Sequence, residues 1–132
     1  MKTEAQEILF TDKDVLSYVQ ALGDRNPVYQ SAEQALQHGY KHIPLPPLMP
    51  VISYQRISVP WELQAPVIHR EQQCTLYQVM FSNEKYKAVI SLSDQRKHGD
   101  YFFVRQTLHL YDLDGHLCFT GVSSLVAGGI HK

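Results

Sequence analysis

Residues 24–29 (DRNPVY) place a carboxylate, a side-chain amide and a phenol close together in the chain. A carboxylate such as that of Asp24 can take part in proton transfer to or from a reacting group. The phenol of Tyr29 has an ordinary pKa near ~10, so at neutral pH it would position water or donate a hydrogen bond rather than act as a base. Asp24 and Asn26 also favour tight turns, and a loop that simply ends a helix is the alternative interpretation.

The remaining reactive residue types give weaker signals. The seven histidines are scattered, and neither C-x-x-C nor H-E-x-x-H spacing occurs, so no metal site is expected. His38 and His42 could each replace a base if the chain folded them toward Asp24, although loop histidines are usually exposed. Cys74 and Cys118 both lie in predicted strands, where small buried residues are expected rather than a disulfide.

Length and composition predict one globular domain, residues 1–132, with 44% hydrophobic and 19% charged residues. The net charge of −1 gives no reason to expect a nucleic acid or membrane partner. Residues 1–9 lack the apolar run of a secretory signal, and no stretch is long enough to span a membrane, so a cytoplasmic protein is expected. The one basic cluster, residues 95–98 (QRKH), is predicted to be a solvated loop.

Two helices are expected early in the chain. Thr11 can cap the first, whose apolar residues repeat at helical spacing up to Leu22, and Gly23 supplies its stop. A capping-box pattern at residues 31–34 then opens a short second helix that ends at residues 38–39.

A proline-rich stretch, residues 43–50 (IPLPPLMP), leads into a third helix. Prolines are tolerated near a helix start, so this helix is expected to begin at about Pro46 or Pro47. Residues 48–57 are mostly apolar and hold few charges, and the helix should therefore be largely buried.

From His69 onward the hydrophobic period changes to two. Residues 86–93 and 102–110 alternate apolar and polar side chains, and residues 114–115 (DG) give a strong hairpin signal before a last strand over residues 117–125. Strands linked by hairpins form an antiparallel sheet. The predicted fold class is therefore α+β, with four strands forming a curved sheet around a central helix.

Three segments resemble one protein family. Residues 21–29 (ALGDRNPVY) resemble the G-D-x-N-P-[aliphatic]-H loop of MaoC-like (R)-specific enoyl-thioester hydratases. Residues 39–48 (GYKHIPLPPL) are similar to the G-Y-x-G-x-x-A-P-P-T segment of the FAS1-like branch, the MaoC dehydratase N-terminal domain. Residues 67–72 (VIHREQ) are similar to that branch's h-h-H-G-x-Q segment, and the resemblance spans roughly residues 10–126.

The resemblance implies a hot-dog fold, in which an antiparallel sheet wraps a central helix and active sites lie at a dimer interface. It also implies reversible loss of water from a 3-hydroxyacyl thioester on CoA or acyl carrier protein. In catalytic members the Asp and His of the loop handle the proton and the water. A backbone amide at a His-Gly pair, where the central helix starts, donates to the thioester oxygen.

Carried over residue by residue, Asp24 and Asn26 match the family's loop. Tyr29 stands at the position of the histidine, and Pro46 and Pro47 stand at the position of the His-Gly pair. Because proline has no amide hydrogen, Pro47 cannot supply the oxyanion donor. Two contributions to catalysis are thus expected to be missing. The resemblance implies that such domains commonly work beside a second hot dog, fused or as a separate subunit, that carries the intact Asp and His.

Pro46, Pro47, Leu48 and His69 are expected to bind substrate; a strand-edge histidine bonded to backbone is the alternative for His69. The favoured function is a dehydratase or hydratase component that needs no cofactor and relies on a partner hot-dog subunit for full catalysis. A homodimer or a heterodimer is expected, because pairing would also hide an exposed strand edge. The alternatives are a non-catalytic subunit that binds acyl thioesters or stabilises its partner and, less favoured, an acyl-CoA thioesterase.

Overall fold

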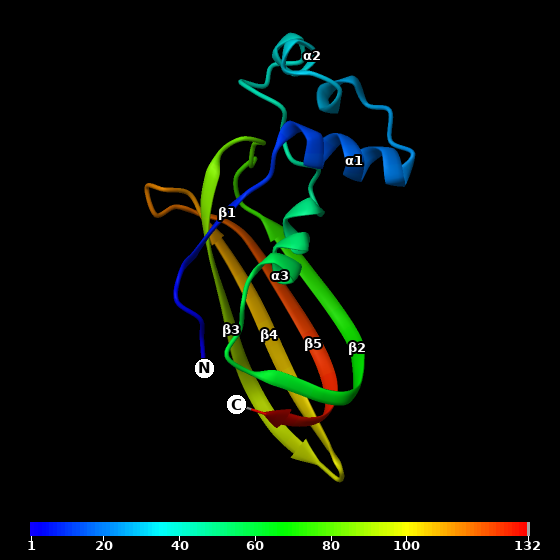
Figure 1. Cartoon of the computed structure of the whole chain (residues 1–132), viewed down its shortest axis with the longest axis vertical. Helices are drawn as coiled ribbons and strands as arrows, with labels where there is room; N and C mark the ends of the chain where they lie inside the picture. Colours follow the sequence, from blue (N-terminus) through cyan, green and yellow to red (C-terminus); the bar gives the residue numbers. More distant parts are fainter. Residues whose placement is uncertain (132) are drawn as a thin grey trace.

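The computed structural model describes residues 1–131, in which five antiparallel strands form one sheet beside several short helices (Figure 1). The strands lie in the order β1-β3-β4-β5-β2, so β1 and β2 are the two edges of the sheet. The strands are β1 (Gln6–Leu9), β2 (Glu62–Leu76), β3 (Lys85–His98), β4 (Tyr101–Tyr111) and β5 (Leu117–His131). The helices are α1 (Asp12–Leu22), α2 (Ala32–Gln37) and α3 (Ser53–Arg56), with the 3-10 helices η1 (Pro27–Tyr29) and η2 (Met49–Ile52).

The first two helices begin and end where the sequence predicts. The Thr11 hydroxyl accepts the Asp14 amide hydrogen at 3.1 Å, and the Asp14 carboxylate accepts the Thr11 amide hydrogen at 2.9 Å. Gly23 ends α1 with a left-handed backbone (φ 73°), which favours glycine. At the start of α2, the Ser31 hydroxyl accepts the amide hydrogen of Gln34 at 3.1 Å. Both predicted helices are therefore confirmed.

The third helix begins later than the sequence predicts. It opens as the 3-10 helix η2 at Met49, rather than at Pro46 or Pro47, and continues as α3. Pro46 and Pro47 explain the delay, since both lack an amide hydrogen and Pro47 disfavours helical backbone at Pro46. Met49 and Ser53 are buried, whereas Leu48 is 60% exposed, so the expected burial holds for one side of the helix only.

The helix formed by η2 and α3 lies across one face of the sheet (Figure 1). The Tyr54 hydroxyl holds the helix against the sheet by hydrogen bonding. Its oxygen lies 2.7 Å from the Gly121 carbonyl oxygen and 2.9 Å from the Gln106 carbonyl oxygen. Trp61 follows the helix, is buried, and donates its indole hydrogen to the Gln106 side chain at 3.0 Å. A curved antiparallel sheet around a central helix is the hot-dog arrangement, so the predicted α+β class is confirmed.

The sheet is more extensive than predicted: β2 begins at Glu62 rather than at His69, β5 runs to His131 rather than to Leu125, and two further segments also differ. One strand was not predicted: β1, a four-residue strand, pairs with β3 and places Ile8 opposite Tyr86. Residues 95–98, predicted as a loop, form the end of β3, where Arg96 pairs with Phe103 of β4. This segment is exposed, as expected for its charge, but the turn at residues 99–100 is short enough for strand pairing to continue up to it.

Burial of Tyr54 predicts a loss of stability in alkaline solution. Desolvation raises the pKa of Tyr54 to about 12, whereas the unfolded chain ionises this group near 10. The contribution is therefore complete below pH ~10 and is lost as the pH rises toward 12, at up to about 1.4 kcal/mol per pH unit. Urea unfolding between pH 9 and 12 measures it, and Tyr54→Phe should flatten the pH dependence whereas the exposed Tyr101→Phe should not.

Candidate functional site

The loop after α1 is held by its own polar side chains. The Asp24 carboxylate accepts the Asn26 amide hydrogen at 2.9 Å, and the Asn26 side chain accepts the Val28 amide hydrogen at 3.2 Å, which caps η1. These bonds are the turn-forming role that Asp and Asn favour. Asn26 thus acts on the loop itself and is not among the residues that line the two cavities described below. The second carboxylate oxygen of Asp24 is not used in this turn.

Five of the residues predicted from the sequence line one cavity of about 290 Å³, here called the loop cavity. It lies between α1, the Asp24 loop and the start of the central helix. Its lining is Tyr18, Leu22, Asp24, Tyr29, Pro46, Pro47 and Leu48. Leu22 and Leu48 are 66% and 60% exposed, so the apolar rim of this cavity is open to solvent.

Tyr29 is half-buried beside Asp24. Burial raises the pKa of the Tyr29 phenol above its ordinary value of 10, and the negative charge of Asp24 raises it further. The phenol therefore stays protonated at neutral pH and can donate a hydrogen bond. Across the loop cavity, Pro47 has no amide hydrogen to offer. The cavity thus combines a carboxylate and a neutral donor with a helix start that lacks its expected oxyanion donor.

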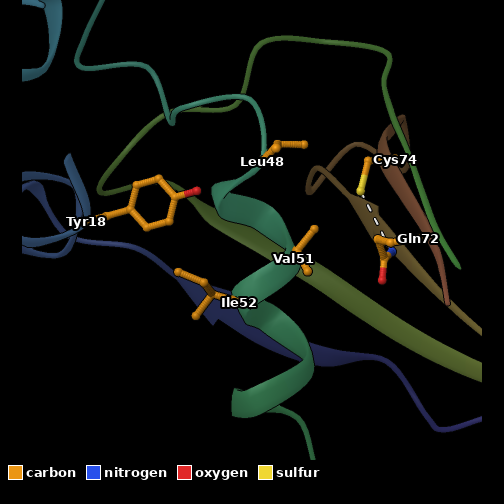
Figure 2. Close-up of a pocket in the computed structure, with 6 residues that line it drawn as sticks. All are labelled: Tyr18, Leu48, Val51, Ile52, Gln72 and Cys74. Atoms are coloured by element: carbon orange, nitrogen blue, oxygen red, sulfur yellow. Dashed lines mark hydrogen bonds between the residues drawn. The ribbon is translucent and has the colours of Figure 1, made fainter. Parts of the chain in front are cut away.

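A larger cavity of about 560 Å³, the helix cavity, lies between the central helix and β2 (Figure 2). It shares Tyr18 and Leu48 with the loop cavity, so the two adjoin. Its lining is Tyr18, Leu48, Val51, Ile52, Gln72 and Cys74. Its walls are apolar apart from Tyr18, the Gln72 amide and the Cys74 thiol.

Sequence reasoning missed Tyr18 and Gln72 as lining residues. Tyr18 sits at helical spacing within an apolar pattern, which is also typical of a core residue. Gln72 lies three residues after His69 in the same motif, and the sequence predicted a substrate contact for the histidine only. Cys74 was expected to be buried and is half-buried, and both it and the buried Cys118 are free thiols.

His69 lies outside both cavities. It is exposed on β2, and its Nε2 atom lies 3.1 Å from the Gln72 side-chain oxygen. The same oxygen accepts a hydrogen bond from the Ser123 hydroxyl at 2.6 Å. His69 therefore contacts a lining residue of the helix cavity, Gln72, without lining the cavity itself. Its hydrogen-bond partner is a side chain and not the backbone group of the alternative interpretation.

His38 and His42 are bonded away from the Asp24 loop. The His38 ring lies 2.8 Å from the Gln34 carbonyl oxygen. The His42 ring lies 3.2 Å from the carboxylate of Asp12, at the opposite end of α1 from Asp24. Neither histidine lines either cavity, so neither is placed to act as a base beside Asp24.

One group of potential metal ligands lies far along the chain from these cavities, in the β4–β5 hairpin. Ligand atoms of Asp112, Asp114 and His116 lie within 4.8 Å of one another. The Asp112 carboxylate accepts the amide hydrogens of Asp114 and His116 at 3.0 and 2.9 Å. These hydrogen bonds, chiefly that from the His116 amide, lower the pKa of Asp112. The cluster is thus explained by the turn that it forms.

The fold and these adjoining cavities define a hot-dog protein with an apolar chamber along its central helix. The chain belongs to the family described as FAS1-like, dehydratase domain region, whose model matches residues 1–127. The family predicted from the sequence is therefore confirmed. A comparison with curated proteins gives no match.

Solved structures of the MaoC-like class share this fold. A chain of the C-terminally truncated HadBC (3R-hydroxyacyl-ACP dehydratase) complex from Mycobacterium tuberculosis matches with a TM-score of 0.78 and 14% identity, over 96% of this chain and 95% of that chain. The (R)-hydratase from A. caviae involved in PHA biosynthesis matches with a TM-score of 0.76 and 15% identity, over 96% and 93%. The ChsH1-ChsH2 complex from Mycobacterium tuberculosis matches with a TM-score of 0.74 and 14% identity, over 96% and 88%.

Within residues 1–131, every helix is too short or too polar to cross a membrane.

Proposed function

We propose that this chain is a component of an (R)-3-hydroxyacyl-thioester dehydratase or enoyl-thioester hydratase that acts on CoA or carrier-protein thioesters. One observation above all supports the proposal: Asp24 and Tyr29 line the same cavity as Pro46 and Pro47, at the start of the central helix. These are the positions at which the family's acid–base loop and oxyanion donor are expected. Because the chain belongs to this family, the positions of Asp24, Tyr29 and Pro47 can be compared with those of the family's catalytic groups.

Dehydration requires that a base remove the proton next to the thioester carbonyl while the β-hydroxyl leaves, protonated, as water. Asp24 is a carboxylate suited to proton transfer, and the protonated Tyr29 phenol can hold the departing or entering water by a hydrogen bond. The developing negative charge on the thioester oxygen also needs a donor, which Pro47 cannot supply. This chain therefore contributes part of the machinery, and a partner hot-dog subunit completes it.

The β2 edge is the surface proposed to bind that partner. β2 has fifteen residues and pairs with β5 along one side, and within residues 1–131 no strand pairs with its other side. Val67 and Ile68 are 48% and 54% exposed on this strand. A long, exposed and partly apolar edge strand is a template for pairing with another chain. Two of the similar structures are themselves complexes, which fits a hot-dog partner.

A second candidate is a subunit that binds an acyl thioester or stabilises its partner without catalysis. The presence of both Tyr29 and Pro47 favours this candidate, since they stand where catalytic members have a histidine base and a glycine amide donor. The two candidates differ in whether Asp24 takes part in a reaction.

Hydration of trans-2-enoyl-CoA of short and medium chain length tests the proposal. The full chain is assayed alone and with an added hot-dog subunit that has both Asp and His, and thioester hydrolysis is followed in parallel. We expect weak activity alone, strong activity with the added subunit, and a loss of about 10²–10⁴-fold in the activity of this chain on Asp24→Ala. Gln20→Ala, an exposed change on α1, is the matched control. Activity that is the same with Asp24→Ala would favour the binding-only candidate.

A further inference from the structure

The side-chain amide of Gln72 is held in one orientation by two donors. Its oxygen accepts the Ser123 hydroxyl hydrogen at 2.6 Å and lies 3.1 Å from Nε2 of His69. An amide whose oxygen is fixed from two sides has its nitrogen fixed as well. The nitrogen of Gln72 therefore points away from Ser123 and along the wall of the helix cavity.

Within residues 1–131, the nitrogen of Gln72 has only a weak acceptor. It donates to the Cys74 sulfur at 3.8 Å, and a thiol sulfur accepts hydrogen bonds weakly (Figure 2). Val51 and Ile52 project from the helix into the same cavity, and neither has a polar atom in its side chain. The cavity thus presents a pre-oriented N–H donor within a mainly apolar chamber.

Gly121 of β5 lies beside the Gln72 amide. A Cβ built on Gly121 would lie 3.2 Å from the Phe119 ring, 3.5 Å from the Gln72 nitrogen and 3.8 Å from the Tyr54 ring. Any larger side chain at this position would therefore crowd the amide as well as Phe119. Glycine at position 121 leaves the Gln72 donor uncrowded by its own strand neighbour.

The Gln72 donor and the Asp24 carboxylate line different, adjoining cavities. Asp24 lines the loop cavity, Gln72 lines the helix cavity, and Leu48 lines both. Leu48 directly follows Pro47 and lies three residues before Val51, so an acyl chain that crosses Leu48 passes from one cavity into the other. An acyl chain whose reacting carbons lie beside Asp24 would therefore bring its more distant carbons to Gln72.

We propose that Gln72 selects acyl thioesters that have an oxygen atom, such as that of a ketone, a few carbons beyond the reacting centre. This inference rests on the proposed function, which makes the ligand an acyl thioester and places its reacting carbons beside Asp24. A plain alkyl chain in the helix cavity would exclude water from the amide without replacing the lost hydrogen bond, which is unfavourable. A site built to bond a substrate oxygen discriminates strongly against the analogue that lacks it.

Calorimetric titration of the full chain tests this inference without any turnover. The ligands are octanoyl-CoA and its 5-oxo, 6-oxo and 7-oxo derivatives. We expect at least one oxo derivative to bind about tenfold more tightly than octanoyl-CoA. Gln72→Leu should remove this preference by weakening the oxo ligand and strengthening octanoyl-CoA. The adjacent Gln73→Leu, whose exposed side chain bonds Glu71, should leave the preference intact.

The outcomes separate this inference from the proposed function. Equal binding of all four ligands to the unaltered chain, or a preference that survives Gln72→Leu, overturns the role of Gln72 and leaves the thioester proposal standing. Failure of every ligand to bind overturns both. A preference that Gln72→Leu abolishes, in a chain without hydratase activity, supports the role of Gln72 together with the binding-only candidate. Circular dichroism spectra that coincide with that of the unaltered chain establish that each variant is folded.

Discussion

Replacing Tyr29 with histidine and Pro47 with glycine in one chain is expected to raise hydration of trans-2-enoyl-CoA by at least about 100-fold over the unaltered chain assayed alone. The first change places a base that titrates near neutral pH beside Asp24, where Tyr29 now stays protonated because burial and the Asp24 charge raise its pKa. The second restores an amide hydrogen at the start of the central helix. Each change corrects one of the two shortfalls of the loop cavity.

The two single variants measure how much each change contributes to the expected increase in hydration rate. Tyr29→His alone should recover part of the acid–base contribution, and Pro47→Gly alone should recover part of the oxyanion contribution. Adding Asp24→Ala to the double variant is the control, because it should return the rate to that of the unaltered chain. A double variant that folds and binds thioester, yet hydrates no faster than the unaltered chain, would show that the missing contributions lie elsewhere.

Ile68→Lys is expected to weaken the proposed dimer by about 100-fold or more. Ile68 is 54% exposed on the edge strand β2, and a two-fold contact would bury the new charge twice. An unpaired charge inside an interface is costly, and lysines on edge strands are a common means of preventing strand pairing. Sedimentation velocity of the full chain at micromolar concentration measures the change as a shift from dimer to monomer.

Leu113→Lys is the matched control for the edge variant. Leu113 is also a large hydrophobic residue, 62% exposed, but it lies in the β4–β5 hairpin rather than in β2. Its replacement should leave the dimer intact. An unaltered chain that sediments as a monomer at micromolar concentration, alone and with a hot-dog partner, would contradict pairing along β2.

Local signals in the sequence predicted much of the fold because the physics behind them is local. The Thr11 cap and the Gly23 stop depend on residues a few positions apart, and α1 has the predicted bounds. The alternation over residues 86–93 likewise predicts the buried face of β3. The predicted start of the central helix is too early, because proline is tolerated in a first helical turn but also disfavours helical backbone in the residue before it, as Pro47 does at Pro46.

The sequence missed β1 for a different reason. Four residues with two apolar side chains give little periodic signal, and the strand exists because Ile8 packs into a core built by distant segments. Its backbone hydrogen-bonding partners lie in β3, nearly eighty residues later in the chain. Such pairing depends on tertiary contact, which local propensity does not encode.

For the candidate site too, the sequence and the tertiary structure each determined a different part. The sequence by itself determined that Asp24, Tyr29 and Pro47 stand at the positions of a known loop and helix start, and that two of them are poor replacements. Only the tertiary structure decided that these residues share one cavity, and that this cavity adjoins a second one beside Gln72. The reason is physical: residue type fixes which proton or hydrogen bond a side chain can offer. Where that group points, and what it meets, depends on the packing of α1, the central helix and β2 against one another.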